Sequence, residues 1–185
     1  MRLFILFISL SCSILLQSQE ALIYTQTFTN LIKQEKLVFD KPDGWFKVFP
    51  LEEDEFLDYD LVLRSEQTGM DIRYVVYPHG HQSRNYPDFD FAKTMASIAS
   101  NEEHHLLFVR GLDSTLLKNE YHAEWGALAT FTPKPNFSEK ERGKILSLHH
   151  STKGSLLIIF LFDGSSEQAN PYLKTLFFQN IKDSG

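Results

Sequence analysis

The sequence predicts an α+β domain with a mainly antiparallel β-sheet and helices packed on it, in an α/β/α sandwich-like arrangement. Three observations support this fold class. Segments of alternating polarity come in pairs joined by short turns, and amphipathic helical segments lie among them. One late segment is apolar on both faces, as expected for a central strand with a layer on each side. The 185 residues suit one domain.

Residues 1–18 have the features of a signal peptide. Arg2 precedes an uncharged apolar run from Leu3 to Leu16, which is shorter than the roughly 18–20 residues that span a bilayer. We favour cleavage after Ser18 among several small residues. We therefore expect a secreted or periplasmic protein with no transmembrane span.

Cys12 is the only cysteine of the chain and leaves a second interpretation open. Ser11 before it and Ser13 after it suit a bacterial lipobox, in which Cys12 would carry a lipid anchor. Only about eight apolar residues precede it, and the apolar run continues beyond it, so we favour simple secretion over a lipoprotein. Removal of this segment leaves a cysteine-free mature chain, without disulfides or cysteine-bound zinc.

Residues 19–35 are expected to be an N-terminal lead-in segment, for which a short strand is one possibility, ahead of a single domain over 36–183. The domain would begin with a hairpin, in which strands at 37–39 and 45–49 flank a turn at 40–44.

The next stretch, 51–60, is strongly acidic. Calcium prefers such oxygen ligands, but the EF-hand spacing and its central glycine are absent, so a solvated acidic loop is favoured. The acidic residues are Glu52, Glu53, Asp54, Glu55, Asp58 and Asp60.

A second hairpin is predicted from strands at 59–65 and 70–77. The return strand alternates in a way typical of a half-buried antiparallel strand. Its apolar face carries Met70, Ile72, Tyr74 and Val76, and its other face Asp71, Arg73 and Tyr77.

A helix follows, starting near Asp88 or Asp90, either of which could cap it, and ending at Asn101. Its apolar stripe is Phe91, Met95, Ile98 and Ala99.

The rest of the domain is mostly strands. Short strands are expected at 106–110 and 114–117 and a longer one at 125–132. A third hairpin pairs 144–150 with 155–162, the strand that is apolar on both faces.

A terminal helix is expected to start at Pro171. Its buried stripe would be Leu173, Leu176, Phe177 and Ile181. The chain contains 16 Phe, and we expect these to build the core of a domain without disulfides. The core candidates are Phe46, Phe91, Phe131, Phe160 and Phe177.

No residue is assigned a catalytic, cofactor-binding or metal-binding role, and no cofactor is expected. The net charge of −6 argues against nucleic-acid binding. There is no G-x-S-x-G elbow and no phosphate-binding glycine loop. Among seven histidines, His79 and His81 form the best pair for a metal, but zinc would need further ligands. The adjacent His149 and His150 would point to opposite faces of a strand.

Several features together resemble the Mog1/PsbP-like fold group, which includes many exported bacterial proteins of unknown function. These features are Pro42-Asp43-Gly44-Trp45, the Trp125-Gly126 strand, the hairpin ending in Phe160-Leu161-Phe162-Asp163, and the terminal helix. The resemblance covers residues 36–183 and implies an antiparallel sheet between helices, with a binding or accessory role and no site residue carried over. We therefore expect a non-catalytic module with a protein or small-molecule partner, and a secreted hydrolase-like enzyme is the alternative.

Overall fold

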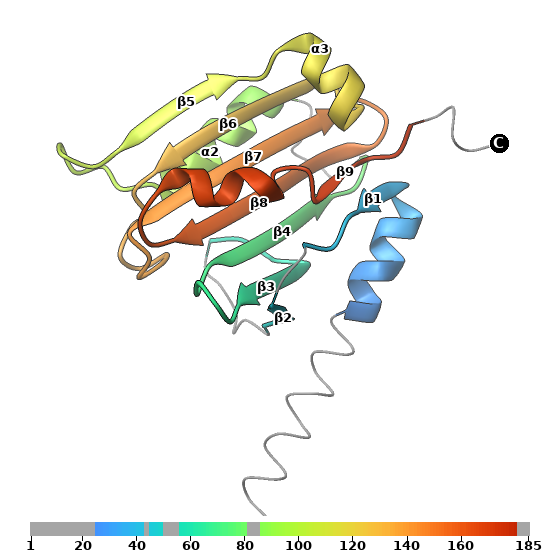
Figure 1. Ribbon diagram of the computed structural model, residues 1–185. Coiled ribbons are helices and arrows are strands. Elements are labelled where there is room, and N and C mark those ends of the chain that lie inside the picture. Colours follow the sequence, from blue (N-terminus) through green and yellow to red (C-terminus); the bar gives the residue numbers. More distant parts are fainter. Residues whose placement is uncertain (1–24, 43–44, 50–55, 81–85, 181–185) are drawn as a thin grey trace, which may run out of the picture.

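Seven antiparallel strands form the central sheet of the computed structural model, which describes residues 25–42, 45–49, 56–80 and 86–180 (Figure 1). This sheet confirms the predicted α+β class. Its strands lie side by side in the order β2 (Phe46–Val48), β3 (Leu61–Ser65), β4 (Asp71–Tyr77), β8 (Gly154–Phe162), β7 (Arg142–His150), β6 (Trp125–Phe131) and β5 (Leu107–Gly111).

The hairpins β3–β4 and β7–β8 are confirmed, with Leu63 opposite Ile72 and Leu146 opposite Ile158. β8 is fourth of the seven strands and all of its residues are buried, as predicted for a central strand. Its side chains alternate between two cores, one on each face of the sheet.

The two faces have different covers. α2 (Pro87–Ile98) lies behind the sheet in Figure 1 and closes the back core. The front core is closed by several smaller elements. These are a helix at 25–34, β1 (Leu37–Phe39), the π-helix η1 (Leu117–Tyr121), the 3-10 helix η2 (Ser166–Tyr172) and β9 (Leu176–Phe178). The short helix α3 (Ser114–Leu116), which leads into η1, buries none of its residues.

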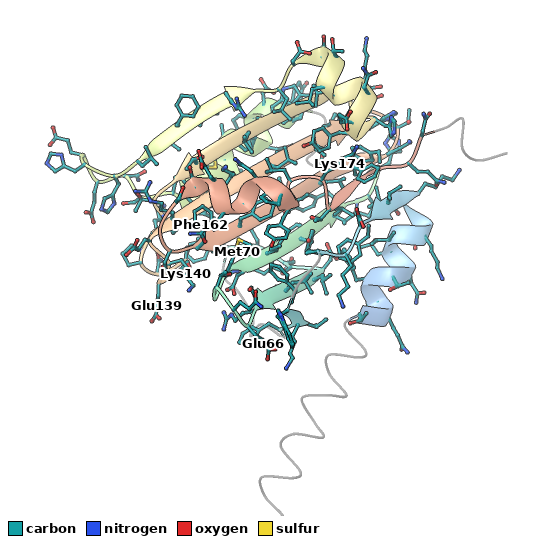
Figure 2. The ribbon with its side chains drawn as sticks, viewed as in Figure 1. Glu66, Met70, Glu139, Lys140, Phe162 and Lys174 are labelled. Atoms are coloured by element: carbon teal, nitrogen blue, oxygen red, sulfur yellow. The ribbon has the colours of Figure 1, made fainter. Side chains whose placement is uncertain are left out.

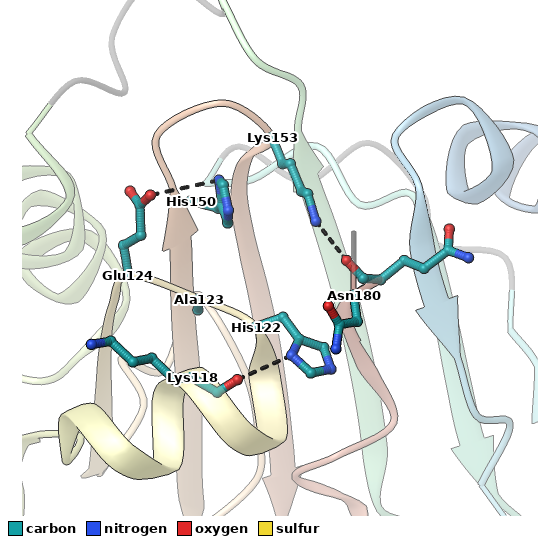
Figure 3. A pocket seen from close by; sticks show the side chains of 8 residues that line it. Lys118, His122, Ala123, Glu124, His150, Lys153 and Asn180 are labelled. Carbon is teal, nitrogen blue, oxygen red and sulfur yellow. Dashed lines mark hydrogen bonds and ion pairs between the residues drawn. The ribbon is translucent and has the colours of Figure 1, made fainter. Parts of the chain in front are cut away.

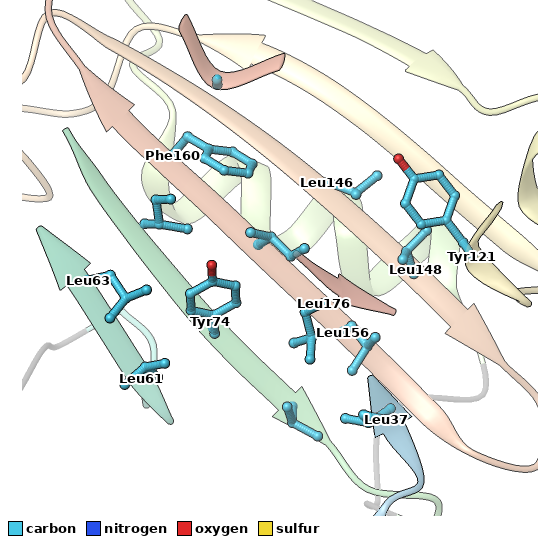
Figure 4. Close-up of a cluster of buried hydrophobic side chains, with 14 of the residues drawn as sticks. Leu37, Leu61, Leu63, Tyr74, Tyr121, Leu146, Leu148, Leu156, Phe160 and Leu176 are labelled. Carbon is cyan, nitrogen blue, oxygen red and sulfur yellow. The ribbon is translucent and has the colours of Figure 1, made fainter. Parts of the chain in front are cut away.

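Tyr74 lies near the middle of the front core (Figure 4). Its ring packs against Phe28 and Phe39, with centroids 5.8 and 5.4 Å away. Its hydroxyl lies 3.0 Å from Thr175 Oγ1, and burial raises the pKa of the phenol. Phe28 belongs to the helix at 25–34, so the described part of the lead-in segment is a helix packed on the front core and does not form the short strand considered for it.

The expected first hairpin is wrong, although both of its strands exist. β1 pairs with β9, Leu37 opposite Phe178, while β2 pairs with β3, Phe46 opposite Ser65. The two segments therefore belong to different sheets. Each short strand finds its partner far along the chain or across a long connection, which local turn chemistry cannot indicate.

The expected terminal helix is also wrong. Pro171 lies inside η2, and the chain then extends into β9. Leu176 and Phe178 are buried and Phe177 between them is half-buried, which is the period of a strand. The proposed stripe residue Ile181 lies outside the described residues. Leu176 and Phe177 fit a helical stripe in the sequence, but pairing with β1 makes residues 176–178 a strand.

Two smaller predictions fail for local reasons. Residues 114–117 are helical because the Asp113 carboxylate accepts hydrogen bonds from the backbone N–H groups of Thr115 (2.8 Å) and Leu116 (3.3 Å). In α2, no side chain caps the first turn. The helix begins at Pro87, which has no backbone N–H and so leaves one fewer donor that needs a partner. Asp90, a proposed cap, is buried instead.

β4 is buried on both faces, and the prediction of a half-buried strand is wrong. Asp71 is 2% exposed and Arg73 is 7% exposed. Asp71 is held by two hydrogen bonds from the Arg64 guanidinium, at 2.5 and 2.8 Å. Ion pairing therefore lets a polar face lie beneath the back layer.

The predicted core phenylalanines Phe46, Phe91, Phe131 and Phe160 are buried, and Phe177 is half-buried. Three other phenylalanine side chains are exposed, namely Phe49, Phe89 and Phe108. The phenylalanine residues therefore do not serve the core alone. Within the described ranges, no helix is both long enough and apolar enough to cross a bilayer. The predicted signal segment and Cys12 lie outside those ranges.

Candidate functional site

A cavity of about 230 Å³ opens beside the front core, at the end of the sheet where the β7–β8 turn, the end of η1 and the chain after β9 meet (Figure 3). Four of its lining residues have basic side chains and one has a carboxylate. The lining residues are Lys118, His122, Ala123, Glu124, His150, Lys153, Gln179 and Asn180.

η1 places Lys118 and His122 on one wall. This helix has the wide π form and ends at His122, whose backbone is left-handed (φ 49°). The His122 ring is fixed because its Nδ1 lies 3.0 Å from the Lys118 carbonyl oxygen, a contact in which Nδ1 donates. The Lys118 ammonium makes no hydrogen bond or ion pair to any described residue. π-Turns in helices often occur at functional sites.

The β7–β8 turn supplies the opposite wall. The Thr152 backbone N–H donates to His150 Nδ1 at 3.2 Å, so the neutral ring carries its proton on Nε2. Lys153 Nζ donates to the Gln179 carbonyl oxygen at 2.6 Å, which joins the turn to the chain after β9. The His150 ring packs against the buried ring of Phe178, with the two centroids 5.7 Å apart.

The walls carry a net positive charge. Burial lowers the pKa of His150, and burial with the nearby charge of Lys36 lowers that of Lys153. The Glu124 carboxylate accepts hydrogen bonds from the Ser151 backbone N–H (2.9 Å) and hydroxyl (3.0 Å), which lower its pKa. Because both basic groups are partly dehydrated and close to other cations, an anion in the cavity would stabilise their charged forms.

A second polar cluster lies at the same end of the sheet but behind it. His149 Nδ1 lies 2.9 Å from Ser155 Oγ, on the strand next to it. Burial lowers the pKa of His149, and the charges of Glu124 and, to a smaller extent, Asp90 oppose this shift. Asp90 is buried, and its Oδ2 has no hydrogen-bond partner among the described residues. Ser155 is only 4% exposed.

The structure describes only some of the other residues singled out, and residues 52–55 of the acidic stretch lie outside the described ranges. His81 lies outside the described residues, so the His79–His81 pair stays a prediction. His149 and His150 do point to opposite faces, as predicted. Asp60 of the acidic stretch accepts a 2.6 Å hydrogen bond from the Val76 N–H, and burial raises its pKa. Among described residues, no three His, Cys, Asp or Glu side chains lie together as metal ligands.

Sequence reasoning missed this cavity because its walls come from segments near 118–124, 150–153 and 179–180. His122 and His150 stood out only as members of a set of seven. The π-helix and the left-handed turn after it have no sequence signal that we could use.

Comparison with protein-family models and with curated protein sequences finds no match to this chain. The resemblance to the Mog1/PsbP-like group therefore stays a prediction.

Proposed function

We propose that this protein is an exported, non-catalytic binding module that holds a small anionic molecule in the cavity between η1 and the β7–β8 turn. The observation that carries this proposal is the set of four basic residues that line the cavity, Lys118, His122, His150 and Lys153. A cavity of about 150 Å³ can hold benzene, so this one has room for phosphate or a short dicarboxylate.

The electrostatics favour an anion over a cation or a neutral ligand. The one carboxylate of the wall, Glu124, is already hydrogen-bonded to Ser151. Lys118 has no anionic partner among the described residues, and Lys153 donates only to a carbonyl. A bound anion would therefore gain charge-assisted hydrogen bonds from the two lysines without displacing an ion pair of either. At His150 it would share the protonated ring with the Glu124 carboxylate, which lies 4.0 Å from Nδ1.

The test is a titration of the protein with inorganic phosphate and with succinate, followed by NMR shifts of the histidine ring protons. We expect binding that tightens from pH 8 to pH 6, because His150 gains a proton on complex formation. Lys118→Gln and Lys153→Gln should each weaken binding about tenfold. Lys93→Gln, on exposed α2 surface, is the matched control and should bind as the natural protein does.

Two results contradict this proposal. One is the absence of any shift at 10-fold excess over millimolar protein, and the other is equal binding by the Lys118, Lys153 and Lys93 variants.

Export is a separate part of the proposal, supported by the apolar run at 3–16 behind Arg2. Mass spectrometry of the N-terminus in an exporting host tests it. A chain that begins near residue 19 supports simple secretion, a diacylglyceryl-Cys12 species supports the lipoprotein alternative, and an unprocessed N-terminus contradicts both.

A hydrolase-like enzyme is the second candidate function, favoured by the Ser155, His149 and Asp90 cluster. The hydroxyl and imidazole are at hydrogen-bond distance, and a buried carboxylate lies nearby. The burial of Ser155 places this candidate second, because a substrate needs access to the nucleophile. Ester hydrolysis that disappears in Ser155→Ala would support it, and hydrolysis unchanged in that variant would contradict it.

A further inference from the structure

β5 forms an edge of the central sheet (Figure 1), and Figure 2 shows the side chains of the domain in the same view. Within the described part of the chain, β6 is its only strand partner. The four consecutive apolar residues from Leu106 to Val109 are each between 41% and 59% exposed. All five residues of the strand are exposed, so both of its faces meet solvent.

The opposite edge of the same sheet is built differently. β2 has three residues, and its central side chain is Lys47, which is 70% exposed and paired with Glu66 at 2.5 Å. A short strand with an outward lysine is a common protection against edge-to-edge pairing. β5 is longer, and Arg110 is its only charged residue. One edge is therefore protected and the other is open.

The hydrogen-bond pattern fixes which backbone groups of β5 are free. Thr132 N–H donates to the Leu106 carbonyl and Leu112 N–H to the Gly126 carbonyl. Even-numbered residues of the strand thus bond to β6, and the N–H and C=O groups of Leu107, Val109 and Gly111 point outward. These outward groups are spaced evenly about Val109.

We propose that a second copy of this chain pairs with β5 in antiparallel register, with the two-fold axis at Val109. Val109 then lies opposite its own copy and Leu107 opposite Gly111, which forms about six backbone hydrogen bonds. Leu106 lies opposite Leu112 of the other copy. The two central sheets become one continuous sheet across the axis.

The pairing of Arg110 with an aromatic ring selects this register. Arg110 lies opposite Phe108 of the other copy, at a position where side chains approach closely, so each guanidinium can stack on an aromatic face. No charge faces a like charge. If the axis lay at Leu107 instead, His105 of one copy would lie opposite Val109 of the other, and both Arg110–Phe108 pairs would be lost.

The exposed area sets the expected strength. With full side-chain areas of roughly 150–200 Å² each, the exposed fractions of Leu106–Val109 and Leu116 leave about 400 Å² of apolar surface on each chain. Two chains bury at most about 800 Å² of side-chain surface, the size class of weak, transient pairs. The dimer should therefore depend on concentration.

Sedimentation equilibrium of the complete chain between 10 μM and 1 mM tests this surface. The average mass should approach twice that of one chain at the highest concentration. Val109→Lys would place two ammonium groups opposite each other across the axis. Because these repel, the average mass of this variant should stay at that of a single chain. Phe89→Lys is the matched control, because Phe89 is 68% exposed on α2, and it should associate as the natural chain does.

Cross-linking tests the register independently of that variant. In a Cys12→Ser background, Val109→Cys should form a disulfide dimer on mild oxidation, because hydrogen-bonded antiparallel pairs have Cα atoms about 5.5 Å apart. Leu107→Cys should not, since its copy is roughly four residues away along the strand. The proposal is overturned if the natural chain is a monomer at 1 mM or grows beyond a dimer. It is also overturned if Val109→Lys associates as Phe89→Lys does, or if positions 107 and 109 cross-link equally. Pairing with an extended peptide from another protein but not with itself also overturns it.

Discussion

Gly143 lies beneath the ring of Phe131, its partner across the β6–β7 ladder, and we predict that Gly143→Ala destabilises the protein. A Cβ atom at position 143 would lie 2.4 Å from Cζ of that ring and 2.7 Å from both Cε atoms. Carbon atoms pack at about 3.5–4.0 Å, so the ring would have to move by about 1 Å or more.

The surroundings leave little room for that movement. Phe131 is fully buried in the back core, where Ile145 and Leu161 are also fully buried. Overpacking of this kind costs about 1–3 kcal/mol, and we expect about 2 kcal/mol in the free energy of unfolding. For a chain of this length, such a loss lowers the Tm by about 4–8 °C.

Urea unfolding and calorimetry of four variants test the reasoning. Gly111→Ala is the control, because its Cβ would meet nothing within 4 Å, and it should change stability by no more than about 0.5 kcal/mol. Phe131→Leu should be destabilised on its own by loss of packing. The double variant Gly143→Ala/Phe131→Leu should be no less stable than Phe131→Leu alone. Additive losses in the double variant, or an unaffected Gly143→Ala, would refute the contact as the cause.

Two further predictions concern buried polar groups. Asp71→Ala should lower the free energy of unfolding by about 3–5 kcal/mol, because it leaves the buried guanidinium of Arg73 without the nearby carboxylate. Arg64→Ala should lower it by less, because the Arg64 side chain is 39% exposed. A larger loss for Arg64→Ala than for Asp71→Ala in chemical denaturation would contradict this prediction. Burial lowers the pKa of His149 below its ordinary 6.5, so the unfolded chain binds more protons below that pH, and stability should fall as the pH drops through about 6.5. The slope between pH 5 and 7.5 should be smaller in His149→Gln, and an unchanged slope would show that this imidazole does not contribute.

Much of the central sheet could be predicted because its signals are local. The period of two in β4, the turn between β7 and β8, and the apolar run of β8 each report a neighbour within a few residues. The helix α2 was likewise visible in its stripe of apolar residues. The predictions of the first hairpin and of the terminal helix failed for one shared cause, since β1 and β9 are stabilised by pairing across the length of the domain.

The candidate cavity was beyond sequence reasoning for the same reason. Lys118, His150 and Gln179 become neighbours only when η1, the β7–β8 turn and the chain after β9 meet at one end of the sheet. No spacing along the chain relates them, and the π-helix that orients His122 depends on how its residues pack.

The sequence by itself determined the α+β class, the main hairpins and the central strand, because hydrophobic period and turn chemistry act over short distances. It also predicted that His149 and His150 would face opposite ways, since alternation belongs to any strand. Only the tertiary structure decided which layer covers each face, why Asp71 and Arg73 can be buried, and which edge of the sheet has no further strand partner among the described residues. Those features depend on contacts between distant segments, and their energies are settled only when the whole chain is packed.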